Sequence, residues 1–183
     1  MEWTVKNRMQ INISKTKSML ITTRQKLSLS HKTALRIVAD TIPIESVHEH
    51  KTLGVIIDQH LTFNSHILKL TKQTAQKVHR LSKIKHFLDE HARVIFFKAH
   101  IQSNLDYCST VWDMCPSYTI KRLCSLHKRA LRLVSDVHTE QSEVLYERLH
   151  ILPPKKRFLF NKAKFIHKIL HHNTLSYLTN LFK

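Results

Sequence analysis

The chain contains a single glycine, Gly54, among its 183 residues. A globular chain of this length would normally carry about a dozen glycines, at the usual ~7%. A glycine that is kept where almost all others are absent indicates a local backbone requirement, such as a bend, a bulge or a close approach. The residues that follow it, Val55, Ile56 and Ile57, are β-branched. We therefore expect Gly54 to lie in or beside a β-strand.

The charge of the chain is strongly positive. Lys and Arg number 30 against 13 Asp and Glu, which gives a formal net charge of +17. Such a surface favours a polyanionic partner, and nucleic acid is the commonest one. An anionic membrane surface is a competing interpretation, and a solvated surface without a partner is another.

The cysteines and the apolar segments restrict the environment of the protein. Cys108, Cys115 and Cys124 are odd in number and lack metal-ligand spacing, so we expect no zinc site and no metal. Unpaired cysteines favour a reducing compartment, the cytoplasm or the nucleus. No apolar stretch approaches ~18 residues, and the N-terminus does not resemble a signal peptide. We therefore expect neither a transmembrane segment nor a membrane partner.

The first third of the sequence predicts mixed α and β structure. Residues 3–9 are typical of the end of a helix, and residues 18–22 of a short strand. Residues 35–44 predict a hairpin that turns at Asp40 and Thr41, with Pro43 favouring an edge strand. Residues 52–58 give the strongest strand prediction. Together these segments predict a small antiparallel unit.

From Thr62 onward the apolar residues repeat with the 3.6-residue period of a helix. The boundary between the two patterns lies near Leu61. We expect an α+β fold, with an antiparallel part over residues 1–61 and a mostly helical part over residues 62–183. The predicted helices follow the first one, which begins near Thr62, and cover residues from Asp89 or Glu90 to 105, then 120–134, 142–149, 157–171 and 175–182.

The first predicted helix separates apolar from basic residues. The apolar face comprises Ile67, Leu70, Val78, Leu81 and Leu88, with Thr74 between them, and the opposite face carries Lys69, Lys72, Arg80 and Lys83. No acidic residue occurs between Asp58 and Asp89, so local pairs of opposite charge cannot form. An unopposed basic face of this kind would suit a phosphate backbone, although a merely solvated face has the same sequence.

No self-contained active site is evident from the residues alone. The sequence has no Asp-x-Asp pair, and Asp89-Glu90 is typical of a helix N-cap and its first turn. The clustered acidic ligands of two-metal phosphoryl transfer are missing. Chance adjacency explains histidine pairs such as His48/His50. We expect Trp112 to serve in the core or as an anchor at a helix end, rather than to stack on bases.

The order of short motifs along nearly the whole chain resembles the C-terminal part of reverse transcriptases from LINE-type, non-LTR retrotransposons, especially the jockey-like group. The run Trp3-x3-Asn7-x4-Asn12-x2-Lys15-Thr16 is similar to motif D of that family, and Lys51-Thr52-Leu53-Gly54-Val55-x2-Asp58 to motif E, the primer grip. Later matches are Val111-Trp112 and Leu149-x2-Leu152-Pro153-x3-Arg157. Thr52 stands where the family usually has an aromatic residue, and Leu175 where it commonly has proline.

The resemblance implies roles for named residues. Residues 1–61 would be a palm remnant and residues 62–183 a thumb and C-terminal region. Lys15 would lie near the phosphates of the incoming nucleotide, as a general acid toward pyrophosphate. Leu53, Gly54 and Val55 would hold the primer end, and the basic helix would track an RNA or DNA template–primer.

The metal-binding aspartates of the family, which hold Mg²⁺ in the intact enzyme, would lie upstream of Met1. The resemblance therefore implies a truncated reverse transcriptase without a cofactor and without polymerase activity of its own, which at most binds nucleic acid. Two alternatives remain open: a helical protein–protein interaction module with incidental basic charge, and a non-functional product of a decayed element.

Overall fold

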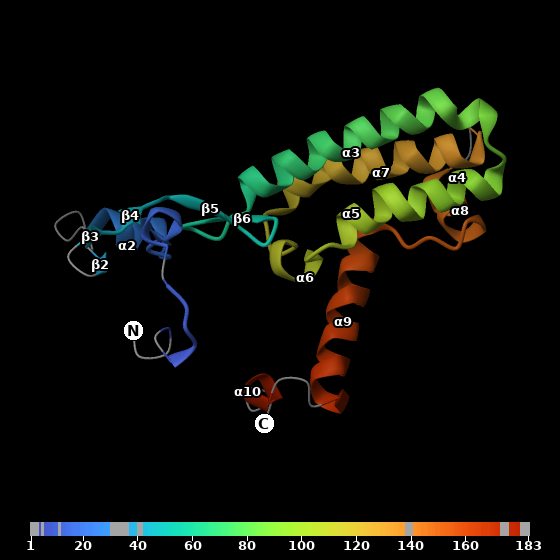
Figure 1. Cartoon of the computed structure of the whole chain (residues 1–183). Helices are drawn as coiled ribbons and strands as arrows, with labels where there is room; N and C mark the ends of the chain where they lie inside the picture. Colours follow the sequence, from blue (N-terminus) through green and yellow to red (C-terminus); the bar gives the residue numbers. More distant parts are fainter. Residues whose placement is uncertain are drawn as a thin grey trace. The chain divides into compact units, whose positions relative to one another are not determined.

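The computed structural model describes residues 4, 6–10, 12–29, 37–39, 42–137, 141–172 and 176–179 (Figure 1). It divides the chain into two compact units, Met1–Ser65 and His66–Lys183. The division falls within the first turn of a long helix, close to the change of period near Leu61. The interpretation of the two parts as palm and thumb stays a prediction.

Strands belong to the first unit, and helices make up the second. Among the described residues no strand follows Asp58, which confirms the predicted helical character of residues 62–183. The α+β fold class is therefore confirmed. The strands form three two-stranded pairs, and they are β1 (Lys17–Ser18), β2 (Val38–Ala39), β3 (Ile42–Pro43), β4 (Glu45–Ser46), β5 (Glu49–Thr52) and β6 (Val55–Asp58).

The β5–β6 hairpin corrects the strongest strand prediction. Residues 52–58 do not form one strand, because Leu53 and Gly54 make a turn between β5 and β6. Both turn residues have positive φ, 47° at Leu53 and 90° at Gly54. A two-residue loop with this backbone matches the right-handed twist of paired strands. The single glycine thus serves a tight turn beside two strands.

The other strand predictions hold in part. The β2–β3 pairing confirms the hairpin around residues 38–43, while Leu35, Arg36, Asp40 and Thr41 lie outside the described residues. The predicted strand at 18–22 is wrong beyond Ser18. The β1 strand ends there and pairs in parallel with β4, whereas the sequence predicted only antiparallel pairing. Of the predicted helix end at 3–9, Thr4 and Lys6 are helical and Trp3 lies outside the described residues.

The carboxylate of Asp58 organises the exit from β6. It accepts hydrogen bonds from the backbone N–H groups of His60 at 3.0 Å, Thr62 at 3.1 Å and Phe63 at 2.6 Å. Burial alone would raise the pKa of Asp58, but these hydrogen bonds outweigh it, so the pKa lies below its usual value. Asp58 therefore binds the donors of the segment that leads into the next helix.

The second unit consists of helices joined by short connections. A 3₁₀ turn, η1 (Ile13–Lys15), and helix α2 (Arg24–Leu29) precede it in the first unit. The helical unit comprises α3 (Asn64–Ile84), which starts at the end of the first unit, then η2 (Lys85–Phe87), α4 (Glu90–Phe96), the π-helical η3 (Phe97–Gln102), α5 (Ser103–Asp106), α6 (Ser109–Trp112), α7 (Ser117–Ser135), α8 (Ser142–Arg148), α9 (Pro154–His172) and α10 (Ser176–Thr179).

The predicted start of α4 is confirmed, whereas α7 begins at Ser117, three residues before the predicted Ile120. Asp89 caps α4 by accepting the N–H of Ala92 at 2.7 Å. The α9 helix begins at Pro154, earlier than the predicted Arg157, because proline suits the first helical position. Leu175 and residues 180–182 of the last predicted helix lie outside the described residues. None of the helices that the structure describes is long and apolar enough to cross a lipid bilayer.

The core of the helical unit joins segments that are distant in sequence. Val78 and Leu81 of α3 pack with Phe97 and Ile101 of η3 and with Leu131 of α7, and Figure 1 shows α3 beside α7. The predicted inner face of α3 is confirmed, although Leu88 lies beyond that helix and is only half-buried.

The predicted inner face of α7 needs a correction. Leu126 and Leu133 are only half-buried, whereas His127 and Leu131 are buried. The buried face of α7 therefore differs from the predicted one, and it includes His127, whose ring forms hydrogen bonds with Gln102 and Tyr146. Trp112 is fully buried, as predicted for a core residue.

Replacing Leu53 with Asn should stabilise the β5–β6 hairpin by about 1 kcal/mol, because the left-handed region costs an ordinary side chain roughly 1–2 kcal/mol and suits Asn. Hydrogen exchange of the β5 and β6 amides should slow by about fivefold. Leu53→Val is the control and should speed exchange, since branching at Cβ disfavours positive φ. Faster exchange in the Asn variant would contradict the turn assignment.

Candidate nucleic-acid interface

The exposed face of α3 gathers the four predicted basic residues. At about 100° per residue, Lys69, Lys72, Arg80 and Lys83 fall within an arc of about 80°, opposite the buried residues. Lys72, Arg80 and Lys83 are exposed and Lys69 is half-buried. Within the described part of the chain, no carboxylate lies within 4.0 Å of any of the four. The structure thus brings the predicted residues together as one unpaired stripe.

The positive charge of Lys69 affects the pKa of a neighbouring histidine, His66. His66, in the first turn of α3, is buried, and its pKa is lowered first by burial and then by the charge of Lys69. His66 therefore stays neutral near pH 7 and adds no charge to the stripe.

Two further helices carry basic residues without any acidic ones. In α7 these include the exposed Lys121, Arg122 and Arg129, and in α9 the exposed Lys155, Lys156, Lys164 and Lys168. Of these residues, only the cluster Lys155-Lys156-Arg157 was predicted as an alternative binding site, although the absence of Asp and Glu from residues 117–135 and 154–172 is visible in the sequence. The basic surface of the helical unit is therefore wider than the stripe on α3.

The residues implied by motifs D and E lie in the first unit. Lys15 is exposed at the end of η1, where the Asn12 side chain accepts its N–H at 3.2 Å. Leu53 is 85% exposed at the hairpin tip, with Gly54 exposed beside it, while Val55 is buried at 4% exposure. Only the first two members of the predicted primer-grip set therefore have accessible surface.

The described residues include no group of three or more His, Cys, Asp or Glu side chains that could hold a metal ion. The cysteines do not form a reactive set either. Burial raises the pKa of the Cys115 thiol, and the charge of Asp113 adds to this effect. Burial likewise raises the pKa of Cys124, against the opposing charges of Lys155 and Lys128. These thiols remain protonated near neutral pH.

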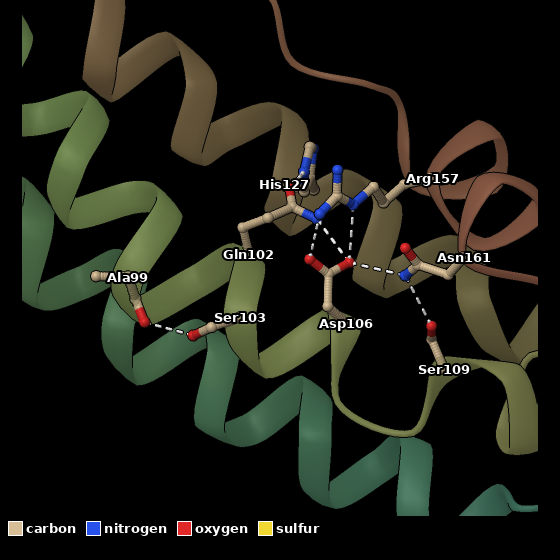
Figure 2. Close-up of polar contacts among 8 residues, drawn as sticks. All are labelled: Ala99, Gln102, Ser103, Asp106, Ser109, His127, Arg157 and Asn161. Carbon is tan, nitrogen blue, oxygen red and sulfur yellow. Dashed lines mark hydrogen bonds and ion pairs between the residues drawn. The ribbon is translucent and has the colours of Figure 1, made fainter. Parts of the chain in front are cut away.

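Asp106 is the centre of a polar network that the sequence analysis missed (Figure 2). Arg157 binds its two carboxylate oxygens with Nε at 3.0 Å and Nη2 at 2.8 Å. Asn161 donates to Asp106 at 3.1 Å and to the hydroxyl of Ser109 at 3.0 Å, and Gln102 donates to Asp106 at 3.1 Å. We call these five residues the Asp106 clamp. The clamp joins α9 to η3, α5 and α6.

The pKa values of the central pair agree with this geometry. Burial would raise the pKa of Asp106, but hydrogen bonds from Arg157, Asn161 and Gln102 and the charge of Arg157 lower it below its ordinary value. The pKa of Arg157 is raised, chiefly by its hydrogen bonds to Asp106. The pair is therefore ionised across the physiological range.

The network continues from Gln102 into the core. Because the amide nitrogen of Gln102 faces Asp106, its oxygen faces His127, at 3.3 Å from Nε2. That ring nitrogen must therefore donate, and Nδ1 accepts from the hydroxyl of Tyr146 at 3.1 Å. The fully buried imidazole is neutral, since burial lowers the pKa of His127 to about 4 against the opposing charge of Asp106.

The π-helical η3 places Gln102 in this chain of donors. The wide turn ends where Ser103 donates its N–H to the carbonyl of Lys98. It leaves both Ile101 and Gln102 buried, one in the apolar core and one in the polar network. Short π-helical segments inside α-helices occur frequently at functional sites.

The clamp gives a structural meaning to the motif that ends in Arg157. Arg157, Asn161 and Gln102 all donate hydrogen bonds to Asp106. These contacts connect α9 to η3, α5 and α6.

Comparison with known proteins agrees with part of the sequence-based interpretation. The chain is 23% identical over 137 residues to a probable RNA-directed DNA polymerase from transposon X-element of Drosophila melanogaster. The alignment covers 73% of this chain and 14% of that protein, so the chain spans a small part of the relative's length. No family model matches the sequence, and no solved structure matches it. Most of the chain is thus similar to a region of a transposon RNA-directed DNA polymerase.

Replacing Arg157 with Lys should lower the free energy of unfolding of the helical unit by about 1–2 kcal/mol, because Lys cannot make the two parallel hydrogen bonds. Partial exposure of the pair keeps the loss below the 3–5 kcal/mol typical of a buried pair. Urea denaturation followed by circular dichroism measures the change. Lys156→Arg, on the exposed side of the same helix, is the matched control and should change stability by less than about 0.5 kcal/mol.

The buried His127 should make the stability depend on pH. Between the ordinary value of 6.5 and the folded value of about 4, only the unfolded state takes up the proton, so stability falls as the pH is lowered through this window. The slope is at most about 1.4 kcal/mol per pH unit, and the total is on the order of 3 kcal/mol. His127→Gln should flatten the dependence of the unfolding free energy on pH. His66, whose pKa is also lowered, is present in both proteins, so its contribution is the same in the two curves. Parallel curves for the two proteins would contradict the neutral, buried imidazole.

Proposed function

We propose that this chain corresponds to the part of a LINE-type, non-LTR retrotransposon reverse transcriptase that follows the metal-binding aspartates, and that its own activity is to bind nucleic acid through the basic stripe of α3. The jockey-like resemblance of its motifs and the similarity to a transposon RNA-directed DNA polymerase both support this assignment. Under this proposal the helical unit is the thumb, and it binds a template–primer of RNA and DNA.

The observation that carries the proposal is the unpaired charge on α3. Four cationic side chains share one face, and none has a carboxylate partner among the described residues. A cation that is not neutralised within the protein is available to replace the counterions of a phosphate backbone. Contacts of this type position a duplex without reading its sequence.

The remaining roles follow from the same proposal. Lys15 would approach the phosphates of an incoming nucleotide, and the tip at Leu53 and Gly54 would contact the primer end, in an enzyme that supplies the aspartates and Mg²⁺. The chain by itself should not extend a primer, because two-metal phosphoryl transfer needs clustered carboxylates.

A second candidate function is a protein–protein contact through α9. This helix exposes Leu159 at 68%, Phe165 at 47% and Leu170 at 46%, and exposed apolar side chains gathered on one helix are a feature of interaction surfaces. Under this alternative the basic charge would be incidental.

Replacing Lys69, Lys72, Arg80 and Lys83 together with Gln should weaken binding of RNA and DNA duplexes alike, with little dependence on sequence. Each phosphate contact that is lost should reduce the slope of log K against log salt by roughly 0.7–0.9. Fluorescence anisotropy over a series of salt concentrations measures both quantities.

The matched control replaces Lys6, Arg8, Arg24 and Lys26 with Gln. These exposed residues belong to the first unit, and their removal lowers the net charge by the same amount. An equal effect of the two variants would mean that net charge alone determines binding. An unchanged affinity and slope in the α3 variant, with its helicity intact, would overturn the role of the α3 stripe and either transfer it to the cluster Lys155-Lys156-Arg157 or abolish it.

A further inference from the structure

A cavity of about 390 Å³ opens beside the Asp106 clamp in the helical unit. This volume lies within the range of small-ligand sites, roughly 300–1,000 Å³. Its wall comes from η3, from α5, from α9 and from the segment that joins α8 to α9. The residues that matter for its chemistry are Lys98, Gln102, Asp106, His150, Arg157 and Phe160.

The wall carries a net positive charge. Lys98 is exposed and has no carboxylate within 4.0 Å among the described residues. Arg157 uses Nε and one Nη2 hydrogen on Asp106, so its Nη1 donors and the second Nη2 hydrogen remain for another acceptor. Two cations against one carboxylate suit a ligand that brings a single anionic group, such as a phosphate diester.

An aromatic ring stands beside these cations. Phe160 is 49% exposed, and the guanidinium carbon of Arg157 lies 5.7 Å from its ring centroid. This distance is within the range of a cation–π interaction, which helps to fix the ring at the edge of the cavity. An accessible aromatic ring beside cationic side chains is the combination that sites for single-stranded nucleic acid use.

The backbone at His150 is held in an unusual conformation at the same place. His150 has φ of 50°, and hydrogen bonds from His150 to Glu147 at 3.1 Å and from Ile151 to Tyr146 at 3.0 Å fix the turn. The segment 150–152 is also part of the wall of a second cavity of about 550 Å³. The two adjoining cavities leave room for a chain that continues beyond one nucleotide.

We propose that the cavity beside the Asp106 clamp binds one nucleotide of a single-stranded nucleic acid, with the base stacked on Phe160 and the phosphate held by Lys98 and Arg157. This inference rests on the proposed nucleic-acid binding and adds a second site that selects an unpaired strand. The basic stripe of α3 would hold the duplex, and the cavity would hold a single strand.

The test uses the full chain, a labelled oligothymidylate, an abasic oligomer of equal length and a duplex. Phe160→Leu should weaken binding of the oligothymidylate by roughly tenfold, and Phe160→Trp should retain it. Phe165→Leu, at a comparably exposed ring on the same helix outside this cavity wall, is the matched control and should have no effect. The abasic oligomer should bind wild type and Phe160→Leu equally, since it has no base to stack.

The possible failures are distinguishable. Unchanged oligothymidylate binding in Phe160→Leu, or an equal loss for the abasic oligomer, would overturn the single-strand site. If the fourfold α3 variant nevertheless binds the duplex more weakly than wild type does, the proposed function is retained and only the single-strand site is lost. If wild type binds none of the three nucleic acids, the proposed function itself fails, and the single-strand site with it.

Discussion

The carboxylate of Asp106 accepts four hydrogen bonds, two of them from one guanidinium, and the position of α9 depends on it. Arg157 and Asn161 reach it from a helix 51 and 55 residues further along the chain. On its other side, Gln102 connects it to the buried His127 and Tyr146. A half-buried charge with complete pairing is stable, whereas one deprived of its partner is costly. Three residues of the clamp, Gln102, Asp106 and Arg157, also form part of the wall of the cavity beside α9.

The distribution of charge follows from how the few carboxylates are used. Asp58 and Asp89 bind backbone donors at helix starts. Asp113 pairs with Lys162 at 2.9 Å and Asp136 with Lys85 at 2.6 Å. Because these acidic residues are engaged elsewhere, the stripe on α3 and the exposed lysines of α9 have no carboxylate within 4.0 Å in the part of the chain that the structure describes. A chain with 30 basic and 13 acidic residues can therefore keep whole helix faces unopposed.

Part of this architecture is predictable from the sequence, and the reasons differ by element. The inner face of α3 follows from a 3.6-residue period that is almost purely apolar, and the strand beside Gly54 follows from the β-branched residues after it. The turn at Leu53 could not be predicted, since leucine rarely adopts positive φ.

The buried polar network around His127 and Asp106 could not be predicted from the sequence, for a different reason. The burial of His127 was not predicted, because it depends on Gln102 and Tyr146, which lie 25 and 19 residues away. The Asp106–Arg157 pair and the π-helical turn also depend on tertiary contacts, and no local pattern reports them. The basic stripe was predictable as a face, but a face alone does not identify its partner.

The most direct test of duplex binding by the α3 stripe is a lysine footprint on a template–primer duplex. The full chain is acetylated with and without the duplex, and mass spectrometry measures the rate at each lysine. If the α3 stripe binds the duplex, Lys69, Lys72 and Lys83 become protected, while Lys6 and Lys26 keep the rates of the free protein. Equal protection at every lysine, or none at the α3 positions, would contradict it.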